Sequence, residues 1–413
     1  MNGSRVQARR AIEALRSGVP NRDAVDALGS SQTQIESLFR QRLAAVREGL
    51  PGPGLVFDGD FGGGKSHLLE YLQHIALTER FVTSKVVVSK ETPLHDPAKV
   101  FRAAISAAVV PERRGAAVTE IAGSLDPDGA AFDELYRWTS SDEAELNERF
   151  PATLYLYRNL RGADPELVER ILRFWSGDPL SVAELRRALR QAGEGASWIV
   201  SKASQRELAL QRIRFVARLA AAAGYGGWVL LFDEVELVGR YSLLQRARSY
   251  AEIARWVLGE ESGPLPGLVA VLAITDDFLP FVIDEKHDDE TVPGRLRLRG
   301  EEPLAEQAEL GIEAIRRAAH LERPGEHVLG EAYRKLKAIH ETAYGWEAPD
   351  VAGPAALGTR SMREYVRAWI NEWDLRRLDP SYRPELEFEP VSPDYTEDAD
   401  LETSPDGEQR NGG

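Results

Sequence analysis

One glycine-rich segment restricts the fold of this chain more than any other feature. Residues 59–66 have the sequence Gly-Asp-Phe-Gly-Gly-Gly-Lys-Ser, which matches the pattern Gly-x-x-x-x-Gly-Lys-Ser/Thr. A short apolar run at 55–57 precedes the segment, and residues 67–80 have the apolar spacing of a helix. The β-branched run 85–89 then predicts another strand. The order strand, glycine loop, helix, strand predicts a βαβ unit, and hence an α/β fold with a parallel sheet.

The glycine segment predicts a P-loop, or Walker A motif, that binds the phosphates of ATP. Glycines let the backbone turn tightly and point several N–H groups at one anion, and the N-terminus of the next helix favours that anion. We expect Lys65 to reach the β- and γ-phosphates and Ser66 to bind Mg²⁺. Lysine is scarce, at eight of the 51 basic residues, so its presence in this loop is informative. The expected nucleotide-binding residues are Gly59, Asp60, Phe61, Gly62, Gly63, Gly64, Lys65, Ser66 and His67.

An acidic pair ends a second apolar run. Residues 228–232 are continuously apolar, as a buried parallel strand requires, and Asp233 and Glu234 follow directly. This pattern predicts a Walker B motif, in which Asp233 holds Mg²⁺ and Glu234 orients or deprotonates the attacking water. Burying two acids is costly unless a cation offsets them, and the metal ion would do so. The alternative is a strand that ends in solvent. Glu236 could be a further acid behind the metal ligands, but an exposed loop charge is the favoured interpretation.

Thr275 is a further catalytic candidate. It ends the apolar run 267–274, which predicts another buried strand. In related P-loop ATPases a polar residue at this place lies between the two Walker motifs and contacts the γ-phosphate or the attacking water. The alternative is a threonine that only caps the end of the strand.

Several arginines could place a cation against the charge that develops during phosphoryl transfer. Arg360 and Arg363 lie at the start of a predicted helix at 358–373, and Arg360 is the catalytic candidate. Three others alternate along the chain and would share one face if they lay in a strand: Arg295, Arg297 and Arg299. For these three, a solvated basic stripe is the favoured interpretation.

The remaining pattern predicts four regions. Residues 1–50 form an N-terminal helical element, residues 51–300 form the ATPase core with a helical insertion at about 97–223, and residues 301–380 form a helical C-terminal region. Residues 381–413 contain ten acidic and two basic residues and carry −8 of the formal net charge of −15. We expect this segment to be an acidic, disordered tail. Because the other residues carry only −7, the charge does not exclude DNA binding by the body.

Composition excludes other kinds of chemistry. The chain has no cysteine, which rules out disulfides, thiol nucleophiles and cysteine-ligated zinc. The seven histidines show no metal-ligand spacing. No apolar run approaches the roughly 20 residues that span a bilayer. The charged N-terminus lacks the apolar core of a signal peptide, so a cytoplasmic location is expected.

Four blocks in order carry a resemblance to a known family: 8–29, 59–72, 86–105 and 224–240. With them the chain resembles the BREX-associated ATP-binding proteins, P-loop ATPases of bacterial phage-defence islands whose core is similar to the AAA+ class. The closest resemblance is to the small ATPase of the group, over most of residues 5–380. In this group a Ser/Thr-Pro-Arg sequence tends to start the helix that carries a sensor-2-like arginine. The chain has Gly358-Thr359-Arg360 there, which leaves Arg360 and Arg363 as alternatives.

The resemblance implies MgATP binding and hydrolysis that drives a conformational change in partner proteins or DNA. The implied partners are other phage-defence proteins, while DNA and a second copy of the chain stay open. Two alternatives remain: a nucleotide-gated binding switch with little turnover, and a DNA-loading or translocating AAA+ motor. A small-molecule kinase is disfavoured by the helical insertion and the Asp-Glu pair.

Overall fold

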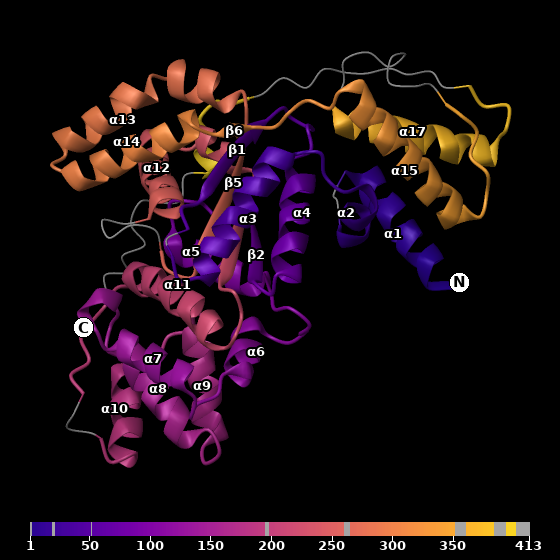
Figure 1. Ribbon diagram of the computed structural model, residues 1–413. Helices are drawn as coiled ribbons and strands as arrows, with labels where there is room; N and C mark the ends of the chain where they lie inside the picture. Colours follow the sequence, from indigo (N-terminus) through magenta and orange to yellow (C-terminus); the bar gives the residue numbers. More distant parts are fainter. Residues whose placement is uncertain are drawn as a thin grey trace.

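The computed structural model describes residues 2–18, 21–50, 52–194, 198–259, 265–351, 361–383 and 394–401. A six-stranded sheet in the order β3-β2-β4-β5-β1-β6 lies at its centre (Figure 1). The strands are β1 (Leu55–Gly59), β2 (Val82–Val87), β3 (Ala108–Val109), β4 (Trp228–Asp233), β5 (Leu268–Thr275) and β6 (Ala319–His320). All neighbouring strands pair in parallel except β2 and β3, which are antiparallel. The predicted α/β class with a mostly parallel sheet is therefore confirmed.

β5, the last long strand in chain order, lies in the middle of the sheet. β5 pairs with β1 on one side and β4 on the other, so that Val271 is opposite both Leu55 and Leu231. Every residue of β4 and β5 is buried, which agrees with the continuous apolar runs in the sequence. In a parallel sheet the carboxyl ends meet at one edge, so the loops that follow β1, β4 and β5 leave the sheet side by side.

Helices cover both faces of the sheet. On one face, α3 (Thr33–Arg47) and α4 (Lys65–Thr78) place Phe39, Leu43 and Leu72 against β1, β4 and β5. On the other face lie α5 (Pro97–Ser106), α11 (Gln205–Ala222) and α12 (Leu243–Leu258). α13 (Asp288–Leu298) and α14 (Glu302–Arg316) pack against α12. The short turns η2 (Val235–Arg240) and η3 (Leu279–Asp284) follow β4 and β5, and a third, η4 (Ala399–Leu401), lies near the C-terminus.

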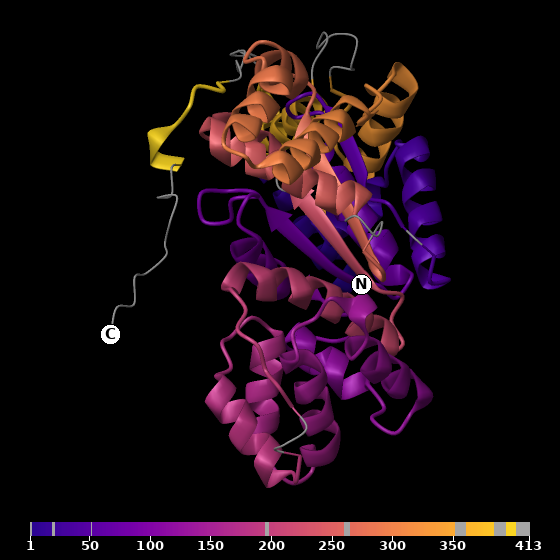
Figure 2. The same cartoon turned by 90° about the vertical axis from the view of Figure 1, so that its left-hand side faces the viewer.

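The connection from β2 to β4 is a helical lobe at the lower end of the sheet (Figures 1 and 2). It is centred on Phe150, Trp175 and Phe215, whose rings lie 5.1 to 5.2 Å apart in the successive pairs Phe150–Phe215 and Trp175–Phe215. Besides α5, β3 and α11 it contains α6 (Ala117–Ser124), α7 (Ala130–Thr139), η1 (Asp142–Ala144), α8 (Arg149–Leu160), α9 (Pro165–Trp175) and α10 (Val182–Gln191).

Helices from both ends of the chain form a separate packed unit, the terminal helix cluster, beside the sheet (Figure 1). Its members are α1 (Asn2–Ser17), α2 (Arg22–Leu28), α15 (Glu326–Tyr344) and α17 (Met362–Leu378). Ile12, Leu336, Trp369 and Trp373 are fully or almost fully buried at its centre. The residues predicted as one N-terminal element, 1–50, thus contribute to two different cores, since α3 packs on the sheet.

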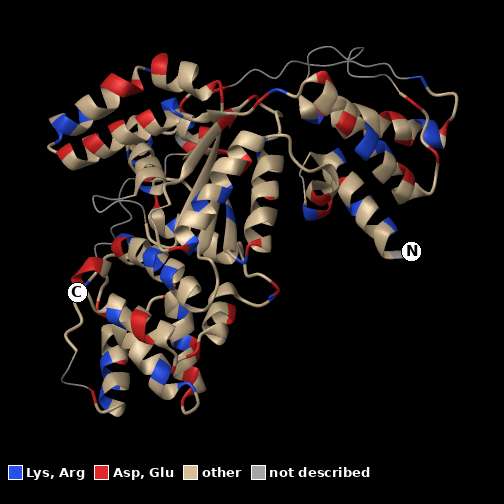
Figure 3. Cartoon of the chain, viewed as in Figure 1, with Lys and Arg blue, Asp and Glu red and all other residues tan. Residues whose placement is uncertain are grey.

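The alternating arginines do not lie in a strand. Arg295 and Arg297 are in the last turn of α13, and Arg299 caps it, so they cannot share one face in the way that a strand would allow. Arg297 pairs with Glu302 and Glu309, and Arg299 pairs with Glu301, all at exposed positions. These contacts agree with the interpretation of solvated basic side chains. Figure 3 shows acidic and basic residues interspersed along the helices of the molecule.

Part of the predicted acidic tail contacts the body of the protein. Residues 394–401 are described by the structure and lie against η2 and the end of β5, where Arg240 pairs with Asp398 and Thr275 contacts Tyr395. This differs from the expectation of a disordered segment over 381–413. Residues 384–393 and 402–413 of that segment lie outside the described residues.

We predict that Gly311 cannot be replaced without loss of stability. A Cβ atom at this position would lie 1.8 Å from the backbone oxygen of Tyr250, because α14 and α12 approach closely there. Gly311→Ala should lower the free energy of unfolding by about 2 kcal/mol or more, as overpacking does. Gly330→Ala is the matched control, since a Cβ there meets nothing within 4 Å. It should raise stability by about 0.5 to 1 kcal/mol. Urea unfolding measures both, and equal effects would contradict the close packing.

Candidate functional site

The glycine loop connects β1 to α4 in a backbone conformation that requires glycine. Gly62 and Gly64 have φ angles of 76° and 105°, in the region that side chains disfavour. The N–H of Gly63 donates to the carbonyl oxygen of Asp60 at 2.9 Å, which closes the turn. The first residue of α4 is Lys65, so the N-terminus of this helix opens directly onto the loop. The loop thus presents backbone N–H groups and a helix N-terminus in the same place.

Lys65 is buried and folded back over the loop. Its Nζ donates to the carbonyl oxygens of Gly59 at 3.0 Å and Asp60 at 3.1 Å. Burial lowers the pKa of Lys65, while the carboxylates of Glu236 and Asp233 act in the opposite direction. The ammonium group is therefore held at the loop by neutral carbonyl groups, and an anion in the loop would offer it a stronger partner.

The acidic pair stands at the end of β4, next to the loop. Asp233 is buried, and its Oδ1 accepts the backbone N–H of Glu234 at 3.1 Å. Its Oδ2 lies 3.5 Å from Nζ of Lys85 on β2. Glu234 has a φ angle of 58°, a conformation that is rare for a residue with a side chain and that often marks functional sites. Partial burial, followed by the charge of Asp233, raises the pKa of Glu234.

Glu236 is not the exposed loop charge that the sequence suggested. The turn η2 directs it toward Lys65, and its Oε2 is inaccessible to water, with no hydrogen-bond partner among the described residues. Burial raises the pKa of Glu236 to about 7, although the charge of Lys65 opposes this. The sequence favoured the exposed charge over a further acid near the metal because an acidic residue in a short loop is usually solvated.

Aspartates on the loop and after β5 form a second polar group. Asp60 accepts a hydrogen bond from the carboxyl group of Asp276 and pairs with Arg323 at 2.8 Å. The hydrogen bond from Asp276 lowers the pKa of Asp60. Burial, together with the bond to Asp60, raises the pKa of Asp276 to about 6. Thr275 directly precedes Asp276 and is buried, opposite Gly59 in the sheet. Its Oγ1 lies 2.7 Å from the hydroxyl oxygen of Tyr395.

A pocket separates the glycine loop from the terminal helix cluster. Its floor is formed by residues 61–68 with Asp233, Glu234 and Glu236. The remaining lining mixes apolar and polar side chains. Its apolar members are Leu15, Leu28, Leu321, Pro324, Val328, Ala332, Met362 and Val366, and its polar members include Gln32, Glu331, Lys335 and Arg363. A charged floor with apolar side chains around it suits a ligand that has a polyanionic part and a flat apolar part.

His67 ties the loop helix to the wall of this pocket. Its Nε2 lies 2.8 Å from the carbonyl oxygen of Gly29 at the end of α2, and since a carbonyl only accepts, Nε2 carries the proton. Burial lowers the pKa of His67. The neutral ring is thus a structural link between α4 and α2, and only the backbone of this residue is available to the loop.

The N-terminus of α17 lies against the loop. Ser361 caps this helix in a capping box with Glu364, and a Cβ on Gly62 would lie 2.9 Å from Oγ of Ser361. The backbone N–H of Arg363 donates to the oxygen of Gly62 at 3.2 Å, and its guanidinium group lies 5.6 Å from the centre of the Phe61 ring. Arg360 lies outside the described residues. Of the two alternatives from the sequence, only Arg363 is among the described residues, and it lies at the loop.

The predicted site residues are therefore close together, with two exceptions. Phe61, residues 62–67, Asp233 and Glu234 line the pocket, and Gly59 and Asp60 lie beneath Lys65. Thr275 lies one strand away, where it contacts Tyr395 rather than the pocket, and Arg360 is not described.

The donor atoms at the loop fit a magnesium ion. Within the part of the chain that the structure describes, no three His, Asp or Glu side chains converge on a common point to form a metal cage. Mg²⁺ does not need such a cage, because it usually takes one or two protein oxygens and completes its shell with water and phosphate. Ser66 and Asp233 supply a hydroxyl and a carboxylate that line the same pocket. Both are hard oxygen donors of the kind that Mg²⁺ prefers.

One comparison with known proteins gives a match. The model of the family "BREX system ATP-binding protein BrxC/D" matches residues 4–124 and 139–286, which is more than half of the chain. The matched ranges include the glycine loop, Asp233, Glu234 and Thr275 and exclude α17 and residues 394–401. No curated protein and no solved structure matches the chain. None of the helices that the structure describes combines the length and apolar character needed to cross a membrane.

We predict that Asp276→Asn stabilises the protein at alkaline pH. The pKa of Asp276 is about 6 in the folded protein against an ordinary value of 3.8, so the stability that its protonated form contributes is lost as the pH rises from about 4 to 6. Asparagine stays neutral and keeps a donor for Asp60. The variant should exceed the wild type at pH 8 by about 1 kcal/mol or less, because solvent screens this half-buried pair, and the difference should shrink toward pH 4.

Urea unfolding without nucleotide, at several pH values between 4 and 8, measures this difference. A difference that does not change with pH would show that the substitution acts through packing and not through the shared proton.

Proposed function

Because this chain belongs to the BrxC/D family of BREX system ATP-binding proteins, which gives it an ATP-binding role in a phage-defence system, we propose that it binds MgATP at the glycine loop and hydrolyses it. The observation that carries the proposal is the meeting of the loop, the N-terminus of α4 and the Asp233–Glu234 pair in one pocket. The fold that we propose is a P-loop ATPase core similar to the AAA+ class. The position of β5 between β1 and β4 supports it, since an added strand separates the two Walker motifs.

The two sides of the pocket match the two ends of ATP. Backbone N–H groups of residues 61–66 and the ammonium group of Lys65 would hold the triphosphate. The apolar side chains of the lining, with Leu28, Val328 and Met362, would receive the base. Ser66 and Asp233 would hold Mg²⁺, which when bound neutralises charge on the β- and γ-phosphates.

Hydrolysis requires a water molecule in line with the γ-phosphate. Glu234 is the group that we assign to this water, because it lies at the pocket and its pKa is raised, which makes it a better base. The water oxygen bonds to the γ-phosphorus as the bond from phosphorus to the β–γ bridging oxygen breaks. The proton of the water passes to Glu234, and ADP and inorganic phosphate are the products. Thr275 would contact the water or the γ-phosphate from the end of β5.

The contact between the loop and α17 offers a route from the nucleotide to the rest of the molecule. Arg363 touches the loop through its backbone and stacks on Phe61, and the helix that carries it packs in the terminal helix cluster. Loss of the γ-phosphate would change these contacts and let the cluster move, as in other nucleotide switches. We propose that this movement acts on other proteins of the defence system or on DNA.

The alternatives differ in turnover and in the response to DNA. A nucleotide-gated switch would bind MgATP with little hydrolysis. A DNA-loading or translocating motor would hydrolyse ATP faster when duplex or single-stranded DNA is added, in a salt-dependent way. Phosphate release with and without DNA separates the three possibilities.

We predict that Lys65 and Glu234 act on different steps. Lys65→Ala removes the cation at the phosphates and should weaken MgATP binding about tenfold or more, the size expected for a charged hydrogen bond. Glu234→Gln keeps the shape of the site and should retain binding while lowering kcat by about a hundredfold or more. Calorimetry with MgATP and a phosphate-release assay measure the two steps. Phosphate release that does not depend on Glu234 would rule out the hydrolytic mechanism and leave the switch.

We predict that Arg363, and not its neighbour on the helix, supports hydrolysis. Arg363→Ala should lower kcat/KM for ATP by about ten- to a hundredfold, because a charged contact near the phosphates is lost. Arg367→Ala is the matched control, since Arg367 is an exposed arginine one turn later on α17 and does not line the pocket. Equal kinetics for both variants would show that the arginine at the loop has no part in the reaction.

A further inference from the structure

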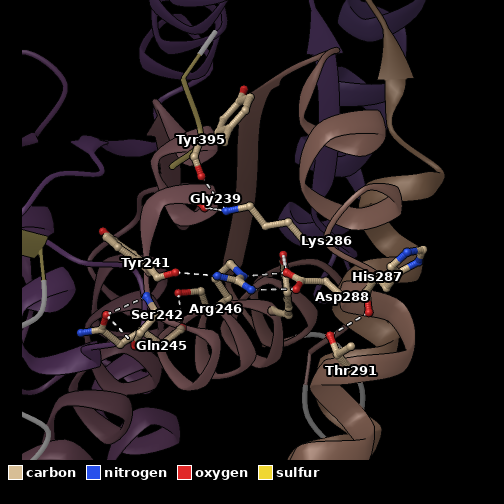
Figure 4. A network of polar contacts seen from close by, with 12 residues as sticks. Gly239, Tyr241, Ser242, Gln245, Arg246, Lys286, His287, Asp288, Thr291 and Tyr395 are labelled. Atoms are coloured by element: carbon tan, nitrogen blue, oxygen red, sulfur yellow. Dashed lines mark hydrogen bonds and ion pairs between the residues drawn. The ribbon is translucent and has the colours of Figure 1, made fainter. Parts of the chain in front are cut away.

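A short acidic segment of the chain is docked beside the proposed site. Residues 394–401, called here the latch segment, lie against η2, the loop after β5 and the N-terminal end of α13. Figure 4 shows Tyr395 above Gly239 and Lys286, with Arg246 and Asp288 below them in this view. The family match does not extend to this segment, so its role has to be argued from the contacts themselves.

The hydrogen bonds of Tyr395 have a defined direction. Its hydroxyl group donates to Oδ1 of Asp277 at 2.6 Å, and a carboxylate oxygen accepts. The phenolic oxygen is then left as the acceptor for Thr275, whose Oγ1 lies 2.7 Å away. Burial, and next the bond to Asp277, raises the pKa of Tyr395, so the hydroxyl keeps the proton that it donates. The hydroxyl proton of Thr275 is therefore directed at Tyr395 and away from the pocket.

The ring of Tyr395 sits in a recess that fits it. It packs edge-on against Phe278 with ring centres 6.1 Å apart, and a Cβ on Gly239 would lie 2.7 Å from the ring. Nζ of Lys286 donates to the carbonyl oxygens of Tyr395 at 2.6 Å and Gly239 at 2.8 Å, which joins the segment to η2.

Basic side chains receive the acidic residues that follow. Arg240 pairs with Asp398 at 2.8 Å, and Arg246 pairs with Glu397 at 2.7 Å. Arg246 is held independently of the segment, because Asp288 binds it through both carboxylate oxygens at 2.8 and 2.9 Å and is itself fully buried. The receiving surface is thus part of the fold. The acidic residues of the segment add two ion pairs, each with at least one partner exposed to solvent, to the packing and hydrogen bonds of Tyr395.

We propose that the latch segment is an autoinhibitory element that holds Thr275 out of the phosphate site. The inference rests on the proposed function, in which Thr275 contacts the attacking water or the γ-phosphate. A docked Tyr395 accepts the hydrogen bond that the Thr275 hydroxyl donates, so the threonine cannot donate to a nucleotide at the same time. Docking of the segment and engagement of the γ-phosphate are therefore mutually exclusive. By linkage each weakens the other, so MgATP favours release of the segment and loss of the segment favours turnover.

The first test compares phosphate release by full-length variants at saturating MgATP. Tyr395→Phe keeps the ring and removes the hydroxyl group, and with it the hydrogen bonds to both Thr275 and Asp277. Because one neutral and one charged hydrogen bond that dock the segment are lost, kcat should rise about threefold or more. Asp400→Asn is the control, because Asp400 is an exposed acid of the same segment, and it should behave as the wild type. A Tyr395→Phe rate equal to or below the wild-type rate would overturn the latch, and a lower rate would show that the tyrosine completes the site.

The second test does not need turnover. In a full-length Glu234→Gln variant, hydrogen exchange at the backbone amides of 394–401 should be slow without nucleotide and should increase with MgATP. Binding of MgATP that leaves the exchange unchanged would overturn the latch, while the proposed hydrolysis would still stand on the phosphate-release assay. An increase in exchange together with no Glu234-dependent hydrolysis would overturn the ATPase proposal and keep the latch.

Discussion

Parallel pairing of β5 with both β1 and β4 determines where the glycine loop and the acidic pair of the pocket lie. The register sets Gly59 of the loop opposite Thr275, and the end of β4 places Asp233 and Glu234 beside them. Because β4 and β5 are buried over their whole length, neither strand can slide without exposing apolar residues. The geometry of the charged groups is therefore fixed by apolar packing several residues away.

A second constraint comes from the terminal helix cluster, which supplies the other wall of the pocket. Ion pairs and hydrogen bonds join its parts across the sequence, among them Arg16 with Asp374 and Arg9 with the carbonyl oxygen of Ala343. His67 and Arg363 link the cluster to the loop from two sides. The pocket thus lies between two separately packed bodies, the sheet with its helices and the terminal helix cluster. In the proposed mechanism, the cluster is the body that moves when the γ-phosphate is lost.

Local patterns in the sequence were enough to predict the main elements. The apolar runs at β1, β4 and β5 and the glycine loop indicated the α/β class. The loop and the Asp233–Glu234 pair line one pocket, as expected for two motifs that bind the same ligand. Features that depend on contacts distant in sequence were not predictable. Tyr395 is 120 residues from its partner Thr275, and nothing in an acidic, Pro- and Ser-rich stretch indicates a docking site. The alternation of Arg295, Arg297 and Arg299 would have placed them on one face of a strand, but the first two lie in the last turn of α13 and the third caps this helix.

The composition of the pocket wall has a consequence for the order of events during synthesis. The loop and the acidic pair can take their places once β5 has been made, at residue 275, but Val328, Met362 and Arg363 belong to the last part of the chain. N-terminal parts of proteins generally fold first during synthesis. A growing chain would hence expose the apolar side of α1 until α15 and α17 arrive to cover it. The pocket is completed late, so a chain that is released prematurely lacks the part of its lining that the terminal helix cluster supplies.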